Sequence, residues 1–594
     1  MAARRWNSLT EMFFEQAAQL GDRPLTFTKK DGQWQSLSWT EIADRVARLA
    51  AALSALGVEQ GDRVVLVSEN RPEWLIADMA IMALGAISVP TYITYTVPDY
   101  LHILENSGAK AAIISSRPLA RTFLKAAHQA DDLIHAITME EAGVEQSLNV
   151  ELHGWQQCLD SATPDLAALK ERAAGVKRED IACLIYTSGT GGAPKGVQIH
   201  HGAILHNCEG ARKVVEPLGL EDNAFLSFLP LSHAYEHTAG QFLPIILGAE
   251  IWYAEGIEKL AVNMTEAKPT IMVVVPRLFE MLRTRLTRQI EKEGGLKQKL
   301  FARCLDLGTR NLTDPGSLGL IDRLLNAFLD RTVRRQVQKK FGGRLRALVS
   351  GGAPLAPDVG YFFAALGLPL LQGYGQTESG PVISVNPPHA PRMHTVGQLL
   401  AETEVKIADD GEILVRGELV MPGYWRDESA TARTIMDGWL HTGDIGRLDE
   451  DGYLEITDRK KDIIVNDKGD NVSPQRIEGL LALEDEIAQA MVYGDRKPHL
   501  VGLIVPDAEW LAGWVKAHGK NGDLADLKTD PDLHKALDTA VSRVNKRLSN
   551  LEKIRRFTIA DEAFSIENRQ MTPTLKVRRH VVNETYRDSL EGLY

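Results

Sequence analysis

The chain contains the stretch Tyr186-Thr187-Ser188-Gly189-Thr190-Gly191-Gly192-Ala193-Pro194-Lys195-Gly196-Val197, a polar and glycine-rich segment between two apolar ones. The apolar run Ile181–Ile185 precedes it, and the apolar residues Val197 and Ile199 alternate with polar ones at its end. Short apolar runs bounded by turn residues are typical of buried strands. The sequence therefore predicts a strand, a polar loop and a second strand.

The composition of this loop is suited to binding an anion. Its glycines let the backbone turn N–H groups outward, its hydroxyls donate hydrogen bonds, and its lysine brings a mobile positive charge. The candidate phosphate contacts are Thr187, Ser188, Gly189, Thr190 and Lys195. The loop is not a Walker A motif, because Pro194 stands where that motif has glycine and Gly196 where it has serine or threonine. Most glycine- and serine-rich segments are plain surface loops, but a fixed position between strands and the ending Pro-Lys-Gly favour a phosphate loop.

The 594 residues, 44% hydrophobic and 25% charged, have the composition of a soluble globular protein and are too many for one core, so at least two domains are expected. The formal net charge of −12 argues against nucleic acid as a partner. The four cysteines lie far apart, without metal-ligand or disulfide spacing, which indicates a reducing cytoplasm. The first residues lack the apolar core of a signal peptide, and the longest apolar stretch, Met79–Ile93, is short for a membrane span. We expect a cytoplasmic protein, with peripheral contact at the inner face of a membrane left open.

The N-terminal part alternates between helical and strand-like patterns. Ser38 and Glu41 have the spacing of a capping box, and apolar residues recur at helical spacing from Ile42 until Gly57. Strands are expected at 64–67, 86–89, 111–114, 225–230 and 270–275, and helices at 72–84 and 98–106. Strands that alternate with helices form parallel βαβ units. The predicted fold class is therefore α/β, with a sheet covered by helices on both faces.

Three later regions differ from this pattern. Residues of about 282–345 are helical and rich in arginine and lysine; such a face is usually solvated, but it can also touch anionic lipid. Short strands alternate with turns over about 397–458, which indicates a small antiparallel subdomain. A charged junction at 459–462 then begins a separate α+β domain. We expect an N-terminal domain of residues 1–458 and a C-terminal domain of residues 459–594.

Two polar segments lie directly after predicted strands, where ligands bind in open α/β sheets. They are Ser350–Pro354 and Gly373–Glu378. Tyr374 offers a flat face for a purine, and Glu378 is a hard oxygen ligand suited to Mg²⁺. The candidate residues are Gly351, Gly352, Ala353, Tyr374, Gly375, Thr377 and Glu378. Each segment alone is equally compatible with an ordinary strand-to-helix turn.

Three further segments complete the pattern. In Trp439–Asp444 the aspartate is placed to accept both hydroxyls of a ribose, although a lone aspartate in a turn is usually a cap. Asp458–Ile464 and Met571–Arg579 follow. Taken in this order, the segments resemble the adenylate-forming superfamily of acyl-CoA synthetases, luciferases and peptide-synthetase adenylation domains, over essentially the full length. Met571–Arg579, Leu229–Glu236 and Val275–Arg277 most resemble the long-chain fatty acyl-CoA synthetase branch.

The resemblance implies a fold and a reaction. The fold is a large N-terminal domain of parallel and mixed sheets with a small β subdomain, followed by a small mobile C-terminal domain. In the reaction, a fatty carboxylate attacks the α-phosphorus of Mg·ATP, which releases pyrophosphate and leaves an acyl-adenylate. The thiol of coenzyme A then forms the thioester and expels AMP. The implied substrates are a fatty acid, ATP and coenzyme A, with Mg²⁺ as the metal cofactor, in a monomer or a homodimer.

The resemblance also implies a role for each site residue. The phosphate contacts are Thr187, Ser188, Gly189, Thr190 and Lys195, the α-phosphate contact is Thr377, and Mg²⁺ is held by Glu378 with Thr187. Tyr374 lies at the adenine, with Gly351, Gly352, Ala353 and Gly375 as further nucleotide contacts, and the ribose contacts are Asp444 and Arg459. The hinge is at Lys461, and Gly469 lies along the coenzyme A channel. The catalytic set is Lys576, His233, Thr377 and Glu378.

Two of these residues have simpler interpretations. Lys576 would bridge carboxylate and α-phosphate oxygens, but it is also readable as a solvated surface lysine. His233 would lie beside the acyl carboxylate, but it is also readable as a buried histidine with a backbone partner. The acyl tunnel is expected within residues 228–279 and 349–378.

Two positions depart from the family pattern. Gly191 replaces a threonine of the phosphate loop, which removes one hydroxyl. Lys468 replaces a small residue along the pantetheine channel, where it would crowd the channel or pair with a phosphate of coenzyme A. A second hypothesis is therefore an acyl-AMP ligase that passes the acyl group to a carrier protein. The third is a non-catalytic acyl- or nucleotide-binding module, against which the intact Lys195, Glu378 and Lys576 argue. No residue points to luciferase-type oxidation.

Overall fold

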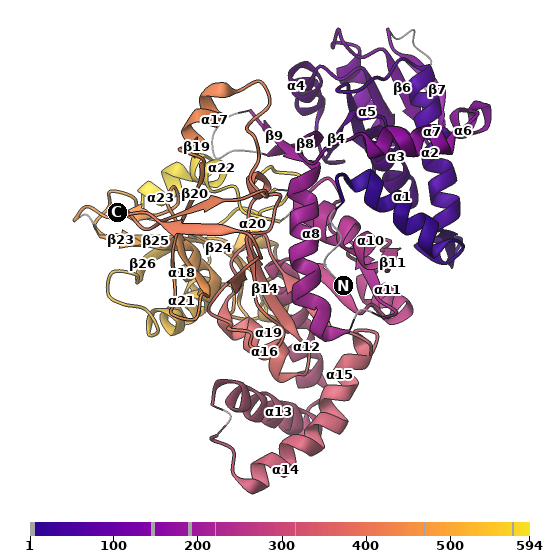
Figure 1. The fold of residues 1–594 in the computed structure, drawn as a ribbon. Helices are drawn as coiled ribbons and strands as arrows, with labels where there is room; N and C mark the ends of the chain where they lie inside the picture. The colour runs from indigo at the N-terminus through magenta and orange to yellow at the C-terminus, as the bar shows by residue number, and fades with distance from the viewer. Residues whose placement is uncertain are drawn as a thin grey trace.

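The computed structural model describes residues 6–143, 149–187, 193–219, 221–314, 316–468, 470–572 and 575–594. Its strands form seven-stranded and nine-stranded sheets, then a five-stranded sheet, and finally a two-stranded and a three-stranded sheet near the C-terminus (Figure 1). Among the described residues, no helix combines the length and the apolar character needed to cross a membrane.

The seven-stranded sheet confirms the predicted parallel βαβ pattern. Its strands, in spatial order, are β7 (Glu151–Gly154), β6 (His135–Thr138), β5 (Ala111–Ile114), β3 (Arg63–Val67), β4 (Ile87–Thr91), β8 (Ile181–Thr187) and β9 (Lys195–His200). All neighbours are parallel except β8 and β9, which pair antiparallel. The glycine-rich stretch thus joins two paired strands, as the sequence predicts.

Both faces of this sheet are buried. In β3, Val64 and Leu66 belong to one core, and the alternating Val65 and Val67 belong to another. The second core is closed by α4 (Val97–Ser107) and α5 (Arg117–Ala127). The first core is shared with the nine-stranded sheet and includes α1 (Leu9–Leu20), α2 (Trp39–Ala55), α3 (Pro72–Ala83) and α8 (His201–Val215). The capping box that starts α2 at Ser38 is confirmed.

The nine-stranded sheet contains the other predicted strands. Its order is β16 (Gln398–Leu399), β15 (Ser384–Val385), β14 (Leu370–Tyr374), β13 (Ala347–Ser350), β12 (Ile271–Val274), β10 (Ala224–Ser227), β11 (Glu250–Tyr253), β1 (Pro24–Lys30) and β2 (Gln33–Ser38). The run from β14 to β1 is parallel, and the edges are antiparallel. Because β14 extends to Tyr374, this residue ends the strand and does not follow it.

The N-terminal part, before residue 459, contains further helices. They are α6 (Trp155–Ser161), α7 (Leu166–Ala174), a 3₁₀ turn (Glu216–Leu218), α9 (Ala234–Glu236), a π-helix (His237–Phe242), α10 (Leu243–Leu247), α11 (Leu260–Ala267), α16 (Pro357–Ala365) and α17 (Glu428–Thr434). The predicted helical region of about 282–345 is confirmed, although it begins earlier, at Pro276. It consists of α12 (Pro276–Glu293), α13 (Gly295–Thr313), α14 (Leu320–Leu329), a π-helix (Asp330–Arg334) and α15 (Arg335–Lys340). In Figure 1, α13 and α14 form the lower tip of the molecule.

The five-stranded sheet is antiparallel, as predicted for the region after residue 397. It contains β17 (Glu404–Ile407), β18 (Glu412–Arg416), β19 (Ile435–Met436), β20 (Trp439–Leu448) and β21 (Leu454–Arg459). The segment Trp439–Asp444 belongs to strand β20, so the alternative of an aspartate that caps a turn does not apply to Asp444. Asp444 lies inside β20, opposite Arg459 of β21.

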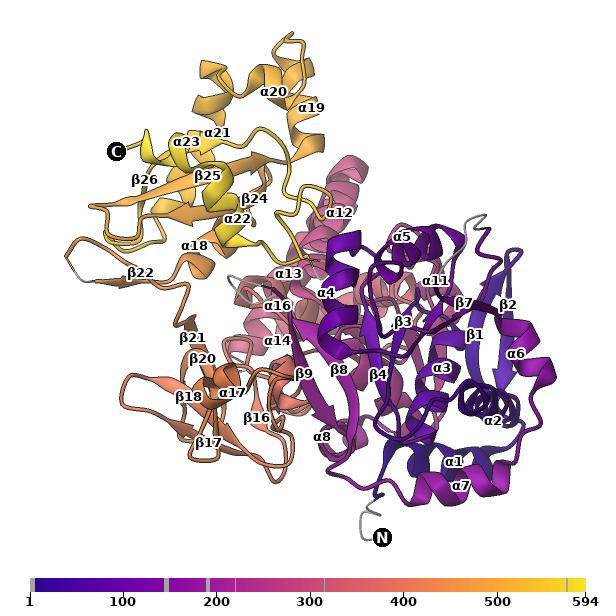
Figure 2. The ribbon, with the colours of Figure 1, turned by 90° about the horizontal axis from the view of Figure 1, so that it is seen from above.

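The C-terminal part has its own sheet and core. Its strands are β22 (Ile464–Val465), β23 (Asn471–Val472), β24 (Ile487–Tyr493), β25 (Leu500–Pro506) and β26 (Ile554–Ile559), and its helices are α18 (Pro474–Leu481), α19 (Ala508–Ala517), α20 (Leu524–Leu527), α21 (Pro531–Asn545), α22 (Arg579–Thr585) and α23 (Arg587–Glu591). Two clusters of buried residues lie within it and contain no buried residue from the large sheets. Figure 2 shows this part beside α12.

Candidate active site

One cavity of about 1770 Å³ gathers the described residues to which the resemblance gives a catalytic, nucleotide or hinge role. Its lining includes Thr187, Lys195, His233, Gly351, Gly352, Ala353, Tyr374, Gly375, Thr377, Glu378, Asp444, Arg459, Lys461 and Lys576. Ser188, Gly189, Thr190 and Gly469 lie outside the described residues. The cavity therefore unites residues from three sheets and from the C-terminal part.

A carboxylate held by two donors lies at one end of the cavity. Asp444 is 5% exposed. The Tyr374 hydroxyl donates to its Oδ2 over 2.7 Å, and Arg459 Nε donates to its Oδ1 over 3.0 Å. Burial and the Asp444 charge raise the pKa of Tyr374 well above its usual value, so the phenol stays protonated and remains a donor. The arrangement fixes an anionic acceptor that is suited to a pair of hydroxyl donors.

Glu378 and Lys195 meet through an aromatic residue that the sequence reading missed. Glu378 lies in a 3₁₀ turn (Thr377–Ser379), and its Oε1 accepts a hydrogen bond of 2.8 Å from the Tyr424 hydroxyl. The ring of Tyr424 faces the Lys195 ammonium, whose Nζ lies 5.0 Å from the ring centroid, a cation–π contact. Lys195 Nζ also lies 3.9 Å from Asp427. Tyr424 thus links a candidate metal ligand to a candidate phosphate contact.

Backbone pairing explains the position of Tyr424. Val197 of β9 forms an isolated antiparallel bridge with Tyr424, the Gln198 N–H donates to the Gly423 carbonyl, and the Trp425 N–H donates to the Gly196 carbonyl. The segment after Pro422-Gly423 therefore extends the edge of the β8–β9 pair. Thr187 and Lys195 lie directly opposite each other at the open end of that pair.

The glycines of the cavity wall are needed for packing inside the protein. A Cβ at Gly351 would lie 2.9 Å from the Tyr235 ring, and a Cβ at Gly375 would clash with the Pro381 carbonyl. Gly352 has φ +83°, in the left-handed region that favours glycine. Packing and backbone conformation inside the protein therefore explain these three glycines without a ligand.

Lys576 enters the cavity from the C-terminal part. It lies on a loop closed by an antiparallel bridge between Met571 and Val577, and its N–H donates to the Thr572 hydroxyl over 3.1 Å. Burial, reinforced by the positive charge of Arg459, lowers the pKa of Lys576 to about 8. The carboxylates of Asp444 and Glu378 act in the opposite direction. Lys576 is thus a cavity residue and not a solvated surface lysine.

His233 lies beside this lysine as a neutral imidazole. Burial, together with the Lys576 charge, lowers the pKa of His233 to about 3. Its Nδ1 accepts a hydrogen bond of 3.2 Å from the Tyr235 N–H, which leaves Nε2 as the protonated nitrogen. The backbone partner and the position in the cavity are both present, so the two interpretations of His233 are compatible.

Few polar contacts join the C-terminal part to the helices of the N-terminal part. Arg288 of α12 donates to Asp507 and Glu509, which lie at the start of α19, over 2.7 Å each. Arg547 donates to Asp358 of α16 over 2.7 Å. All of these ion pairs reach the solvent, so each contributes little to stability.

The chain between the two parts is a short turn. Lys460 N–H donates to the Gly443 carbonyl, and its Nζ donates to Asp410 and Glu412, which ties this residue to the five-stranded sheet. Lys461 follows and is exposed. Lys468 is exposed and is not among the described residues that line the cavity. Crowding of the pantetheine channel by Lys468 and pairing of Lys468 with a phosphate of coenzyme A both stay predictions.

Comparison with known proteins agrees with this geometry. The model of the family described as "AMP-binding enzyme" matches residues 13–425, and that of its C-terminal domain matches residues 461–594. The long-chain-fatty-acid–CoA ligase FadD15 of Mycobacterium bovis is 35% identical, and the match covers 99% of this chain and 97% of the relative.

Two solved structures show the same fold. The adenylation domain of a carboxylate reductase from Mycobacterium chelonae has a TM-score of 0.76 at 20% identity and covers 100% of this chain and 92% of its own. The o-succinylbenzoate coenzyme A synthetase of Bacillus subtilis, solved with ATP and a magnesium ion, has a TM-score of 0.66 at 20% identity, with coverage of 96% and 98%. The cavity, the matched family models and the relative similar over its whole length establish that the chain belongs to the AMP-binding enzyme family.

Proposed function

We propose that the chain is an ATP-dependent long-chain fatty acid–CoA ligase, which forms an acyl-adenylate, then a thioester, and releases pyrophosphate and AMP. The observation that carries this proposal is the position of Lys576, a residue of the C-terminal part, in one cavity with Asp444, Glu378 and His233. The relative named for long-chain fatty acids, similar over its full length, supports the acyl substrate.

In the first half-reaction, a carboxylate oxygen of the fatty acid attacks the α-phosphorus, and the bond from that phosphorus to the pyrophosphate oxygen breaks. The Lys576 ammonium lies between the incoming carboxylate and the α-phosphate and offsets the negative charge that increases in the transition state. Thr377 contacts the α-phosphate. Asp444 accepts the two ribose hydroxyls, and its bonds to Tyr374 and Arg459 keep it in position during the reaction.

The phosphate end of the nucleotide is assigned to the β8–β9 pair. Lys195 and Thr187 bind the β- and γ-phosphates, and the loop residues Ser188, Gly189 and Thr190 remain predictions for the same role. The donor set fits a magnesium ion, because Glu378 and Thr187 supply the oxygen ligands that Mg²⁺ prefers. When bound, the ion neutralises part of the charge on the phosphates. The relative solved with ATP and magnesium supports this assignment.

The acyl end of the cavity is apolar. Val273, Val275, Ala239 and Leu243 line it, within or next to the predicted ranges 228–279 and 349–378. Neutral His233 lies at the junction with Lys576 and donates from Nε2 to the acyl carboxylate. Because a single methylene contributes only about 1–3 kcal/mol to discrimination, we expect neighbouring chain lengths to be accepted.

In the second half-reaction, the sulfur of coenzyme A attacks the acyl carbon, and the bond from that carbon to the AMP oxygen breaks. We assign this step to a second arrangement, in which the C-terminal part beyond a hinge near Lys461 turns and withdraws Lys576, while Arg459 stays paired with Asp444 in the five-stranded sheet. Lys468 then lies along the thiol channel, and Gly469 stays a prediction for the same channel. The small number of solvent-exposed ion pairs to α12 and α16 supports a movable domain.

The α14 face supports peripheral contact of a cytoplasmic enzyme with an anionic membrane. Its apolar residues form an exposed stripe at helical spacing, namely Leu320 (79% exposed), Ile321 (82%), Leu324 (74%) and Phe328 (53%). Exposed arginines lie in α14 and in the two helices that follow it, namely Arg323, Arg331 and Arg335. An apolar stripe with basic neighbours has the composition of an interfacial helix.

Vesicle co-sedimentation tests this contact. The unchanged chain should bind vesicles that contain phosphatidylglycerol better than vesicles of phosphatidylcholine. Ile321→Asp should reduce binding to the anionic vesicles, whereas Leu296→Asp, a matched change of an exposed leucine on α13, should not. Equal binding by both variants contradicts the contact.

One assay tests the reaction itself. Pyrophosphate and AMP release should be measured over a series of fatty-acid lengths, with and without coenzyme A. We expect turnover with long acids and a thioester product when coenzyme A is present. Adenylate without any thioester favours the carrier-protein hypothesis, and no pyrophosphate release with any acid contradicts the enzyme.

A further inference from the structure

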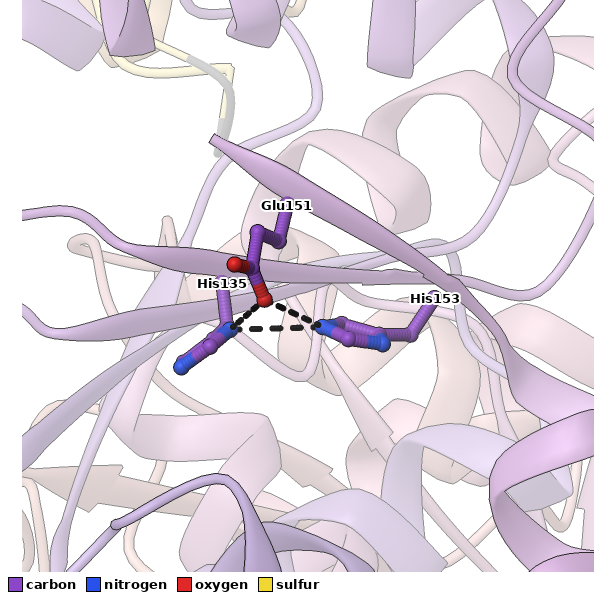
Figure 3. Close-up of side chains that lie close together, drawn as sticks. All are labelled: His135, Glu151 and His153. Carbon is purple, nitrogen blue, oxygen red and sulfur yellow. Dashed lines mark hydrogen bonds and ion pairs between the residues drawn. The ribbon is translucent and has the colours of Figure 1, made fainter. Parts of the chain in front are cut away.

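Three metal-ligand side chains meet at the edge of the seven-stranded sheet, outside the catalytic cavity. His135 begins β6, and Glu151 and His153 lie on the edge strand β7. In the parallel register, His135 is opposite Glu151, and Ile137 is opposite His153. Because residues two apart on a strand share a face, Glu151 and His153 point the same way, and the imidazole of His135 turns towards both (Figure 3).

The spacing of the three ligand atoms is too wide for strong hydrogen bonds. Glu151 Oε2 lies 3.4 Å from His135 Nδ1 and 4.0 Å from His153 Nε2, and the two ring nitrogens are 3.3 Å apart. Good N–H···O bonds are about 2.9–3.0 Å long. Two ring nitrogens and a carboxylate oxygen therefore face a common point, and none of the three pairs forms a short hydrogen bond.

The same spacing fits a tetrahedral metal ion. Zinc–nitrogen and zinc–oxygen bonds of about 2.0–2.2 Å at tetrahedral angles place neighbouring ligand atoms about 3.3–3.6 Å apart. Two of the three separations lie within this range. The third, to His153, shortens when the Glu151 side chain rotates, and this side chain is free to do so because it is 70% exposed.

We propose that His135, Glu151 and His153 bind a zinc ion, with the fourth position open to solvent, and that the ion fastens the edge strand β7 to β6. Imidazole nitrogens and a carboxylate are ligands that zinc prefers. None of the three residues lines the cavity assigned to catalysis. The site is thus separate from the magnesium and nucleotide contacts, and its loss leaves those contacts in place.

Zinc binding to the full-length chain, free of any affinity tag and dialysed against a chelator, tests the proposal. Competition with a fluorescent zinc indicator should show one bound zinc ion per chain that depends on these residues. The melting temperature should rise with the zinc concentration. His135→Gln and His153→Gln should each weaken binding at least about tenfold. His128→Gln is the matched control. It changes an exposed histidine at the end of α5, shortly before β6, and should leave zinc binding unchanged.

Two further measurements keep the test decisive. Glu151→Gln alters only an exposed side chain, so it should fold normally and still weaken zinc binding. Circular dichroism and pyrophosphate release should be the same in all four variants when zinc is absent. Zinc affinity in His153→Gln and Glu151→Gln equal to that of the unchanged chain overturns the proposal.

Discussion

The two walls of the catalytic cavity are built in different ways. On one wall, Asp444, Tyr374 and Arg459 hold one another through hydrogen bonds between strands of two sheets. On the other wall, Lys576 arrives on a loop of the C-terminal part, which reaches α12 through the partly exposed ion pairs of Arg288. Exposed ion pairs contribute only about 0.2–1 kcal/mol each, and hydrogen bonds to charged groups about 1.5–3 kcal/mol.

This difference suits a reaction in two steps. The nucleotide must be held in both half-reactions, so its wall is preorganised and rigid. The charge of Lys576 is needed only while negative charge increases at the α-phosphate. The C-terminal part that carries Lys576 can therefore be attached weakly and can move away afterwards. Each of the following predictions alters one wall and asks whether the other is affected.

The largest effect is expected from Lys576→Ala, which removes the charge from the movable wall. Adenylate formation should fall by about 10²–10³-fold, a loss typical of an electrostatic contact made in the transition state. Thioester formation from preformed acyl-adenylate should stay near the normal rate, because the fixed wall is intact. Lys546→Ala, an exposed lysine of the same domain, is the control. A variant that adenylates normally, or that loses both steps equally, contradicts the assignment.

A smaller but still large effect is expected from Asp444→Asn, which damages the fixed wall. The neutral amide cannot accept from both Tyr374 and Arg459 as a carboxylate does, so one donor loses its partner. The KM for ATP should rise by about 10–100-fold, which corresponds to about 1.4–3 kcal/mol. Asp409→Asn, an exposed aspartate of the same subdomain, should change the KM by less than about twofold.

Unlike Lys576→Ala, the Asp444→Asn change should slow both half-reactions, because acyl-adenylate carries the same ribose as ATP. Binding of preformed acyl-adenylate, followed by fluorescence titration, separates this effect from a loss of folding. Unchanged affinity for acyl-adenylate would show that Asp444 does not contact the ribose.

Much of the fixed wall can be predicted from sequence, since it is made of local patterns. The β8–β9 pair follows from apolar runs on either side of residues 186–197, and the positions of Gly351 and Glu378 follow from polar segments at strand ends. The capping alternative for Asp444 has a local cause. Gly443, with φ +71°, resembles a turn residue, but β20 continues through it. The pairing of β20 with β18 is irregular between His441 and Ile445, and its pairing with β21 is irregular between Ile445 and Gly446.

The residues that the sequence reading missed depend on contacts between distant segments. Tyr424 reaches Glu378 and Lys195 only because residues 423–425 pair with the edge of β9, more than 200 residues earlier in the chain. The partners of Arg288 lie on α19, with a sequence separation of 219 for Asp507. No periodicity or motif within either segment specifies such partners, so they can be found only from the folded arrangement.

The third prediction concerns pH, which changes the charge of Lys576 on the movable wall. Lys576 is charged below its pKa of about 8 and loses its proton as the pH rises through this value. Adenylate formation measured without coenzyme A should therefore fall about tenfold from pH 7 to pH 9, since the charged fraction drops from about nine-tenths to about one-tenth. The pKa of His233, about 3, lies far below this range, so the decline is not due to this group.

Thioester formation from preformed acyl-adenylate provides the internal control for this profile. It should rise over the same pH range, because the attacking thiol of coenzyme A becomes more ionised and Lys576 is not required. Parallel pH profiles for the two half-reactions would mean that Lys576 acts in both, and the proposed division between a fixed and a movable wall would then be wrong.

The smallest effect is expected from Arg288→Ala, which leaves the cavity untouched and weakens only the attachment of the movable wall. Two solvent-accessible ion pairs contribute about 0.4–2 kcal/mol together, so the balance between the two arrangements should shift by about 2–30-fold. Adenylation should slow and thioester formation from preformed acyl-adenylate should accelerate. Arg285→Ala, one turn earlier on the same exposed helix, is the matched control.

Opposite changes in the two half-reactions are the decisive outcome, because a general loss of stability would slow both. Distances between fluorophores on α12 and α19 provide a second readout, and their distribution should move towards longer values in Arg288→Ala alone. If both rates and distances stay unchanged, the ion pairs of Arg288 do not hold the C-terminal part. The weak attachment would then have to lie in the turn at 460–463, where the exposed Lys461 follows Lys460, which is hydrogen-bonded to the five-stranded sheet.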